Sequence, residues 1–141
     1  MTVTSEATTL WHGDLISGSG TTTLDSSGAA GVAVNWRARS EGTASAATPE
    51  ELLGAAHASC FSMGLASALA ANGTPLASVQ TTAAVTLDPA EGVTGTQLLV
   101  SSDIPGITEA DFQRIVEETN AGCPVYRALA GTPITLEAGL V

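Results

Sequence analysis

Residues 48–73 read TPEELLGAAHASCFSMGLASALAANG, and this stretch determines the fold. Its opening threonine is a favoured N-cap residue, Pro49 suits the first helical position, and Glu51 stands three residues after the cap. Gly73 predicts that the helix ends near Asn72. Because no charged residue follows Glu51 within the helix, we expect it to be buried on nearly every side.

Small residues recur through this predicted helix. They would let another backbone come close, and the same helix of a second subunit is one candidate for that backbone. The small residues are Gly54, Ala55, Ala58, Ser59 and Gly64.

The chain before the helix is rich in Thr, Val and Trp and is broken by Gly, Ser and Asp. This pattern predicts strands over Ala7 to His12, Gly20 to Leu24 and Gly31 to Arg39, joined as an antiparallel meander. The segment Glu41 to Ala47 consists mainly of small residues and is predicted to be a loop.

The chain after the helix alternates strand and helix signals. Val79 to Asp88 and Val93 to Ser102 predict a β-hairpin, and Thr108 is expected to cap a second, amphipathic helix. Cys123 and Pro124 are expected to open a short helix that runs through Leu129, and a strand over Pro133 to Leu140 completes the prediction. The inner stripe of the amphipathic helix is expected to hold Phe112, Ile115, Val116 and Thr119.

These elements predict an α+β fold in which a long buried helix packs against a mostly antiparallel sheet. A chain of 141 residues fits one domain, so we expect a single domain over residues 1–141.

The charge balance restricts the possible partners. The formal net charge is −10, and the basic residues are four arginines with no lysine. Such a surface repels phosphate, which argues against nucleic acid and anionic membranes as partners. Polar residues interrupt the apolar stretch from Leu52 to Ala71, and the first residues lack a secretory signal, so we expect a cytoplasmic protein that does not span a membrane.

Cys60 and Cys123 are the only cysteines, and in a reducing compartment they are poor candidates for a structural disulfide. Either thiol could be a buried packing residue, and Cys123 could also cap a helix. Redox chemistry would instead require a thiolate, which the free backbone N–H groups at the start of the short helix could favour at Cys123. Cys60 lies too far along its helix to be activated by the helix dipole, so a cation would have to come from Arg37, Arg39 or Arg127.

Two further residues near Cys60 bear on the chemistry. His57 precedes Cys60 by three residues, but this is the only short-spaced ligand pair, so we expect no metal. Glu50 is ten residues before Cys60, which on a continuous helix is about 15 Å along the axis. A direct contact within one chain is therefore excluded unless the helix bends, and Glu50 could equally be an acid that simply favours the first turn.

Several segments resemble one family. Residues 48–63 are similar to the first-cysteine signature of the OsmC/Ohr peroxidases, and AGCPV at 121–125 is similar to the second. The segments WHGD from Trp11 and RSEG from Arg39 also resemble family segments, so the similarity covers nearly the whole chain. Three features resemble the OsmC branch more than Ohr: His57, the segment Phe61-Ser62-Met63, and an arginine placed shortly before the helix.

The resemblance implies a peroxidase that acts as an intertwined homodimer with two active sites at the subunit interface. Cys60 would be the peroxidatic cysteine and Cys123 the resolving cysteine. Arg39 and Glu50 would position and charge the site, reaching Cys60 across subunits, with Arg37 on the same strand face as the alternative arginine. The substrate would be a hydroperoxide and the reductant an external dithiol, without a cofactor.

Apolar neighbours of the cysteines predict that organic hydroperoxides react better than hydrogen peroxide. The neighbours expected are Leu53, Phe61, Met63 and Tyr126. A competing hypothesis is a non-catalytic module that binds a small acyl ligand or only senses oxidation. A thiol–disulfide oxidoreductase is less favoured because the chain has no Cys-x-x-Cys motif.

Overall fold

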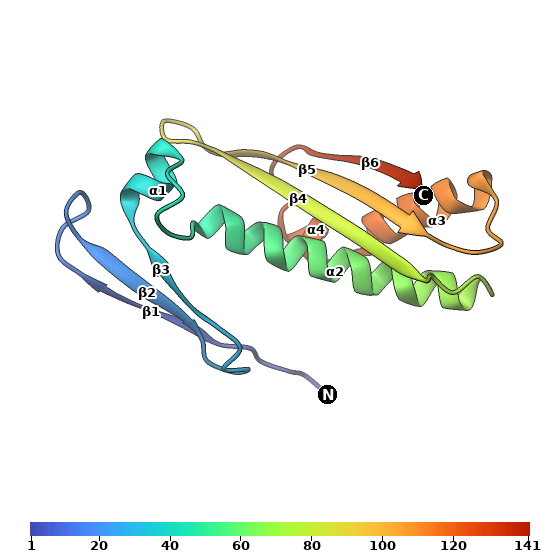
Figure 1. Ribbon diagram of the computed structural model, residues 1–141, viewed down its shortest axis with the longest axis horizontal. Helices are drawn as coiled ribbons and strands as arrows, with labels where there is room; N and C mark the ends of the chain where they lie inside the picture. The colour runs from blue at the N-terminus through green and yellow to red at the C-terminus, as the bar shows by residue number, and fades with distance from the viewer. The chain divides into compact units, whose positions relative to one another are not determined.

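The computed structural model describes all residues from 1 to 141, which form two compact units, residues 1–49 and residues 50–141 (Figure 1). Each unit contains its own three-stranded sheet. The predicted α+β class is confirmed, with two small sheets and one long helix. The single domain expected over the whole chain stays a prediction.

The first unit is built on an antiparallel meander of β1 (Ala7–His12), β2 (Ser19–Leu24) and β3 (Gly31–Val34). The first two predicted strands are confirmed almost to the residue. Threonines pair across the strands, and the side-chain oxygens of Thr9 and Thr22 lie 2.7 Å apart.

The third predicted strand was wrong in its second half, because a short helix α1 (Trp36–Glu41) follows β3. The Asn35 side chain accepts a hydrogen bond from the backbone N–H of Ala38 at 2.8 Å, which caps the helix start. Gly42 ends the helix in the left-handed conformation with φ 70°. These local signals override the strand propensity of the preceding valines.

The helix α2 (Pro49–Ala71) is a single helix of 23 residues, and all of them except Pro49 belong to the second unit. Its predicted start and end are confirmed. Gly73 adopts φ 78°, and its N–H donates to the carbonyl of Ala70 at 3.1 Å. Glu50 and Cys60, ten positions apart, therefore lie on one uninterrupted helix.

The expectation that α2 is buried on nearly every side was wrong for the single chain, in which one stripe is buried. This stripe repeats every three or four residues, as an amphipathic packing surface does. It comprises Glu50, Gly54, His57, Phe61, Leu65 and Leu69.

Gly54 shows why small residues occur within α2. A Cβ added to Gly54 would lie 2.8 Å from the backbone carbonyl oxygen of Ala83, so only glycine lets strand and helix approach this closely. The backbone that comes near this part of α2 is thus a strand of the same chain.

The second sheet has the order β4 (Ser78–Asp88), β5 (Gly92–Asp103) and β6 (Ile134–Leu140). β4 and β5 form the predicted antiparallel hairpin, whereas β6 runs parallel to β5. The parallel pairing follows from the crossover through α3 (Glu109–Gly122) and α4 (Pro124–Ala128).

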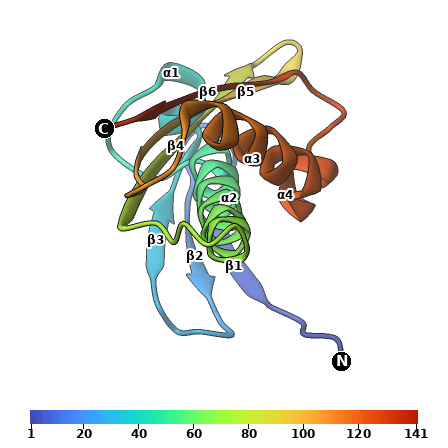
Figure 2. The same ribbon diagram turned by 90° about the vertical axis from the view of Figure 1, so that its right-hand side faces the viewer.

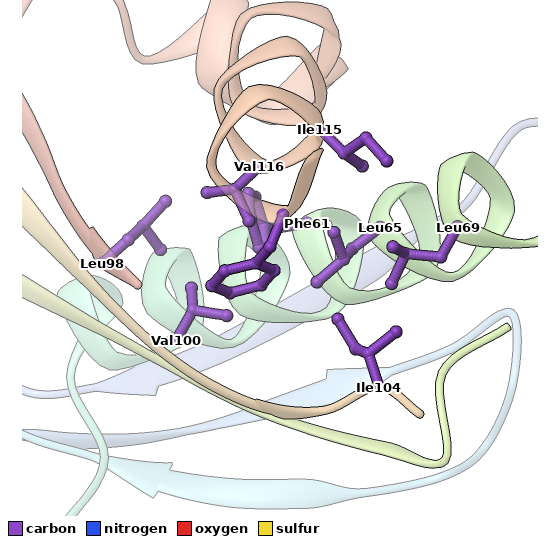
Figure 3. Packing of buried hydrophobic residues seen from close by; sticks show 9 residues of the cluster. Phe61, Leu65, Leu69, Leu98, Val100, Ile104, Ile115 and Val116 are labelled. Carbon is purple, nitrogen blue, oxygen red and sulfur yellow. The ribbon is translucent and has the colours of Figure 1, made fainter. Parts of the chain in front are cut away.

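The core of the second unit lies between its sheet and the helices α2 and α3. Figure 2 shows α2 almost end-on with α3 beside it, and Figure 3 shows their apolar side chains meeting those of the sheet. Thr108 caps α3 as predicted, accepting from the N–H of Asp111 at 3.1 Å, and the predicted inner stripe of α3 is buried. The core comprises Phe61, Leu65, Leu69, Leu98, Val100, Ile104, Phe112, Ile115 and Val116.

By length and composition alone, α2 could cross a membrane. Long core helices of soluble proteins meet the same criteria, and Phe61, Leu65 and Leu69 of α2 lie in the core. The absence of a membrane span stays a prediction.

Candidate active site

The structure brings the two cysteines together. The sulfur atoms of Cys60 and Cys123 lie 3.0 Å apart, although 63 residues separate them in the chain. Both are free thiols, Cys60 half-buried in the middle of α2 and Cys123 buried between α3 and α4. This distance is longer than a disulfide bond, which is about 2.05 Å, and allows a hydrogen bond between the sulfurs.

The local sequence explains how Cys123 is held. Pro124 is the first residue of α4 and disfavours a helical conformation at the residue before it. Cys123 accordingly has an extended conformation, with φ −68° and ψ 122°, which interrupts the helical backbone between α3 and α4. The backbone N–H of Cys123 donates to the carbonyl of Asn120 at 3.2 Å, and this hydrogen bond holds Cys123 in place at the end of α3.

The environment of Cys123 favours its protonated form. Burial raises the pKa of the Cys123 thiol above its ordinary value, and the hydrogen bond to Cys60 raises it further. The backbone N–H groups of Tyr126 and Val125, at the start of α4, oppose this rise. The balance leaves Cys123 as a thiol that can donate a proton toward Cys60, which is a correction to the expectation that the start of α4 would favour a thiolate.

A groove of about 360 Å³ opens beside the two sulfurs. One wall is the face of α2 that carries Gly64 and Ala68, and the other is the end of α3 with Thr119 and Gly122. Gly64 is one of the small residues of the predicted helix, but the sequence alone does not place it in the site. Its spacing of four residues from Cys60, which puts it on the same helix face, was the available signal.

The residues predicted to form apolar surroundings for the cysteines are not the ones that line the groove. None of Leu53, Phe61, Met63 and Tyr126 is among the residues that line this groove. Phe61 is fully buried in the core, because adjacent helix residues point about 100° apart and Cys60 faces the groove. Met63 is 68% exposed.

The two arginines before α2 differ in their environments. Because both lie on α1 and not on a strand, residues 37 and 39 do not share a face, which corrects the sequence interpretation. Arg37 is exposed and forms an ion pair with Glu41 at 3.3 Å. Arg39 is half-buried, and Glu50 of α2 is 6% exposed. The roles expected for Arg39 and Glu50 stay predictions.

His57 lies on the buried stripe of α2, three residues before Cys60. Both of its ring nitrogens are buried without a hydrogen-bond partner, and burial lowers its pKa. A neutral imidazole is therefore expected at this position. No cluster of three or more His, Cys, Asp or Glu side chains could hold a metal ion.

Comparison with known proteins identifies relatives of this chain. Residues 42–137 match the family model described as OsmC-like protein. Peroxiredoxin OsmC of Escherichia coli (strain K12) is 37% identical over 140 residues, which cover 97% of this chain and 96% of the relative.

Solved structures share the fold. An OsmC-like protein from Mycoplasma pneumoniae has a TM-score of 0.75 at 18% identity, with 100% of this chain and 99% of the other covered. The organic hydroperoxide resistance protein OhrB of Bacillus subtilis has a TM-score of 0.71 at 21% identity, with coverage of 97% and 98%. The sequence matches and the shared fold agree, and the chain belongs to the OsmC-like protein family.

Proposed function

We propose that this protein is a thiol peroxidase that reduces organic hydroperoxides, with Cys60 as the attacking thiolate and Cys123 as the resolving thiol. The observation that carries the proposal is the 3.0 Å distance between two free cysteine sulfurs that line one groove. The 37% identity to a protein named Peroxiredoxin OsmC supports the same activity.

The first step is a nucleophilic displacement on the peroxide. The Cys60 thiolate attacks one peroxide oxygen, the O–O bond breaks, and the departing alkoxide takes a proton to become an alcohol. Cys60 is oxidised to a sulfenic acid and the hydroperoxide is reduced. Both cysteines line the groove, but Cys60 suits this role because it is half-buried, whereas Cys123 is 4% exposed.

The second step forms a disulfide. The sulfur of Cys123 attacks the sulfenic sulfur of Cys60, and the hydroxyl leaves as water with the thiol proton. The sulfurs need to approach by only about 1 Å to reach bonding distance. An external dithiol then reduces the disulfide and is itself oxidised to a disulfide, which returns both cysteines to thiols.

Arg39 and Glu50 complete the proposed site. The guanidinium of Arg39 would stabilise the Cys60 thiolate and the charge that develops on the departing oxygen, and Glu50 would orient the guanidinium. Glu50 lies about 15 Å along α2 from Cys60. An extended arginine or a second subunit is therefore needed to link them, and we propose a homodimer.

The proposed partners are small hydroperoxides and a dithiol reductant in the cytoplasm, without nucleic acid or membrane. A net charge of −10 with four basic residues is consistent with this assignment. The preference for organic hydroperoxides rests on the groove of small residues next to Cys60, in place of the apolar neighbours expected from the sequence.

Rapid mixing of the reduced protein with an alkyl hydroperoxide tests the proposal, followed by mass spectrometry of the product. We expect stoichiometric peroxide consumption and a Cys60–Cys123 disulfide. Cys60→Ser should abolish the reaction, whereas Cys123→Ser should still allow one oxidation, to a sulfenic acid that dimedone traps on Cys60.

A different outcome would favour the competing hypothesis. A module that binds an acyl ligand or senses oxidation would consume no peroxide catalytically in the presence of a dithiol, and both serine variants would bind the ligand as the unchanged protein does. Slow oxidation of both cysteines at equal rates would likewise contradict the assigned roles.

A further inference from the structure

The groove beside the sulfurs follows one face of α2. Cys60, Gly64, Ala68 and Ala71 are spaced by three or four residues and all line it. Eleven residues separate the first from the last, which corresponds to about 16 Å along the helix axis. The groove thus begins at the reactive sulfur and continues along a wall of small residues.

Gly64 is the residue of this wall that requires an explanation. Glycine in the middle of a helix is less favourable than alanine because it loses more conformational freedom on folding. Gly54, the other glycine of α2, is required by the backbone carbonyl of Ala83 at 2.8 Å. At Gly64 no backbone atom is so close, and the only atom near an added Cβ is the methyl group of Thr119, at 3.2 Å.

The short distance from an added Cβ to Thr119 shows in which direction a side chain at position 64 would point. Thr119 belongs to the opposite wall of the groove, so any side chain at Gly64 would extend across the groove toward α3. Position 64 is one helical turn, about 6 Å, from Cys60. A larger residue would therefore close the groove directly beside the sulfur.

We propose that Gly64, together with Thr119 on the facing wall, determines how bulky a hydroperoxide can be when it reaches Cys60. This inference rests on the peroxidase function proposed above and specifies for that site that the organic group next to the peroxide is uncharged and that position 64 limits its bulk. Gly64 acts as a specificity-determining residue, since it touches the organic group and not the reacting oxygens.

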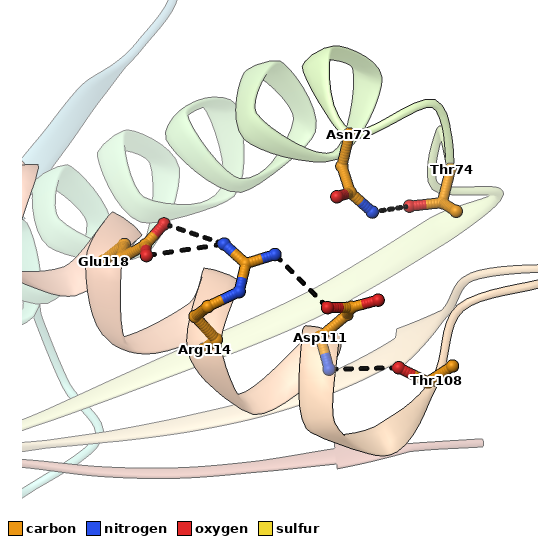
Figure 4. A network of polar contacts seen from close by, with 6 residues as sticks. All are labelled: Asn72, Thr74, Thr108, Asp111, Arg114 and Glu118. Carbon is orange, nitrogen blue, oxygen red and sulfur yellow. Dashed lines mark hydrogen bonds and ion pairs between the residues drawn. The ribbon is translucent and has the colours of Figure 1, made fainter.

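The charges at the groove agree with an uncharged substrate. Glu118 is the only carboxylate among the lining residues, and Arg114 pairs with it at 3.3 Å (Figure 4). None of the residues that line the groove is a cation, and the proposed mechanism engages Arg39 with the Cys60 thiolate, so it would not be free to bind a carboxylate on the substrate. The net charge of −10 also repels anions.

The test compares the value of kcat/KM for cumene hydroperoxide with that for hydrogen peroxide. In Gly64→Leu we expect kcat/KM for cumene hydroperoxide to fall by about tenfold or more. The value for hydrogen peroxide should change by less than about twofold, because hydrogen peroxide has no organic group that needs room. Ala110→Leu adds the same side chain at an exposed position of α3 outside the groove, and it should leave both values unchanged. Equal changes for the two peroxides, or no change for either, would overturn the proposal.

A second measurement does not depend on turnover or on one variant folding. In the Cys123→Ser background, Cys60 is alkylated with iodoacetamide, which is small, and with N-phenylmaleimide, which is bulky. The quantity compared is the alkylation rate with N-phenylmaleimide divided by the rate with iodoacetamide. This ratio should be lower in Gly64→Ala than in the protein with Gly64, and lower still in Gly64→Leu. A constant ratio would contradict the inference. If no peroxide is turned over at all, the peroxidase function fails, while the alkylation ratio still decides whether Gly64 controls access.

Discussion

Helices α2 and α3 share one core but differ in their outer faces. The outward side of α3 is charged, and Arg114 pairs with Asp111 and Glu118 at 3.3 Å each (Figure 4). The outward side of α2 carries no charge after Glu51 and is exposed in the single chain. Its exposed residues include Ala55, Ala56, Ser59, Met63, Ala66 and Ala70.

The difference indicates that the two helices are built for different surroundings. The outer face of α3 is adapted to water, whereas exposed apolar surface of the kind on α2 usually marks a protein interface. This supports the proposed homodimer, with the outer face of α2 as the contact surface. Substitutions on the two faces of α2 and on the outer face of α3 should therefore have different effects.

The buried face of α2 should give the largest effect on stability. Phe61→Ala leaves a cavity among Leu98, Val100 and Val116 of the core, and we expect the free energy of unfolding to fall by about 3 to 5 kcal/mol. Met63→Ala, on the exposed face two residues away, should cost less than about 1 kcal/mol in a monomer. Urea unfolding at one fixed protein concentration measures both, and equal costs would contradict the contrast between the faces.

The outer face of α2 should govern association. Met63 is 68% exposed, and Met63→Glu would put a charge into the proposed dimer interface. We expect the dimer dissociation constant to rise about a hundredfold or more, equivalent to roughly 2.8 kcal/mol. Ala110→Glu, which adds the same charge to an exposed position of α3, should have no effect.

Sedimentation velocity over a range of concentrations distinguishes the outcomes. An unmodified protein that stays monomeric at high concentration would remove the dimer from the proposed mechanism. A dimer that Met63→Glu does not weaken would place the interface elsewhere.

The sequence predicted α2 and α3 well because their signals are local. Pro49 and Gly73 mark the ends of α2, and Thr108 marks the start of α3. α1 was missed, although Asn35 and Gly42 are the same kind of local signal, because the valines before them suggested that the strand continued.

The site could be predicted only in part. The adjacency of Cys60 and Cys123 came from a family resemblance, since no spacing rule brings together residues 63 positions apart. The groove depends on how closely α2 and α3 pack where Gly64 faces Thr119, and no single segment encodes this distance. The burial of His57 likewise depends on the sheet that covers α2.

His57 should make stability depend on pH through the buried face of α2. Burial lowers the pKa of this imidazole in the folded protein, whereas the unfolded chain takes up the proton near pH 6.5. Above that pH both states are neutral and His57 contributes no pH dependence. As the pH falls below about 6.5 the unfolded state gains a proton that the folded state does not, so the free energy of unfolding decreases until the lowered pKa is reached.

Urea unfolding between pH 7.5 and 5.5 measures this effect. His57→Gln should flatten the profile in this range, and His12→Gln, at an exposed position of β1, should leave it unchanged. A profile that His57→Gln does not alter would show that the imidazole takes up its proton equally in both states.

The charged face of α3 should give the smallest effect. Arg114→Ala removes two ion pairs, but the side chains involved are about half exposed, so solvent screens them strongly. We expect the free energy of unfolding to fall by less than about 1 kcal/mol, and the difference to shrink in 1 M salt. A larger loss that persists in salt would mean that Arg114 holds Glu118 at the rim of the groove by packing as well as by charge. The outer face of α3 would then resemble that of α2 in depending on contacts that exclude water.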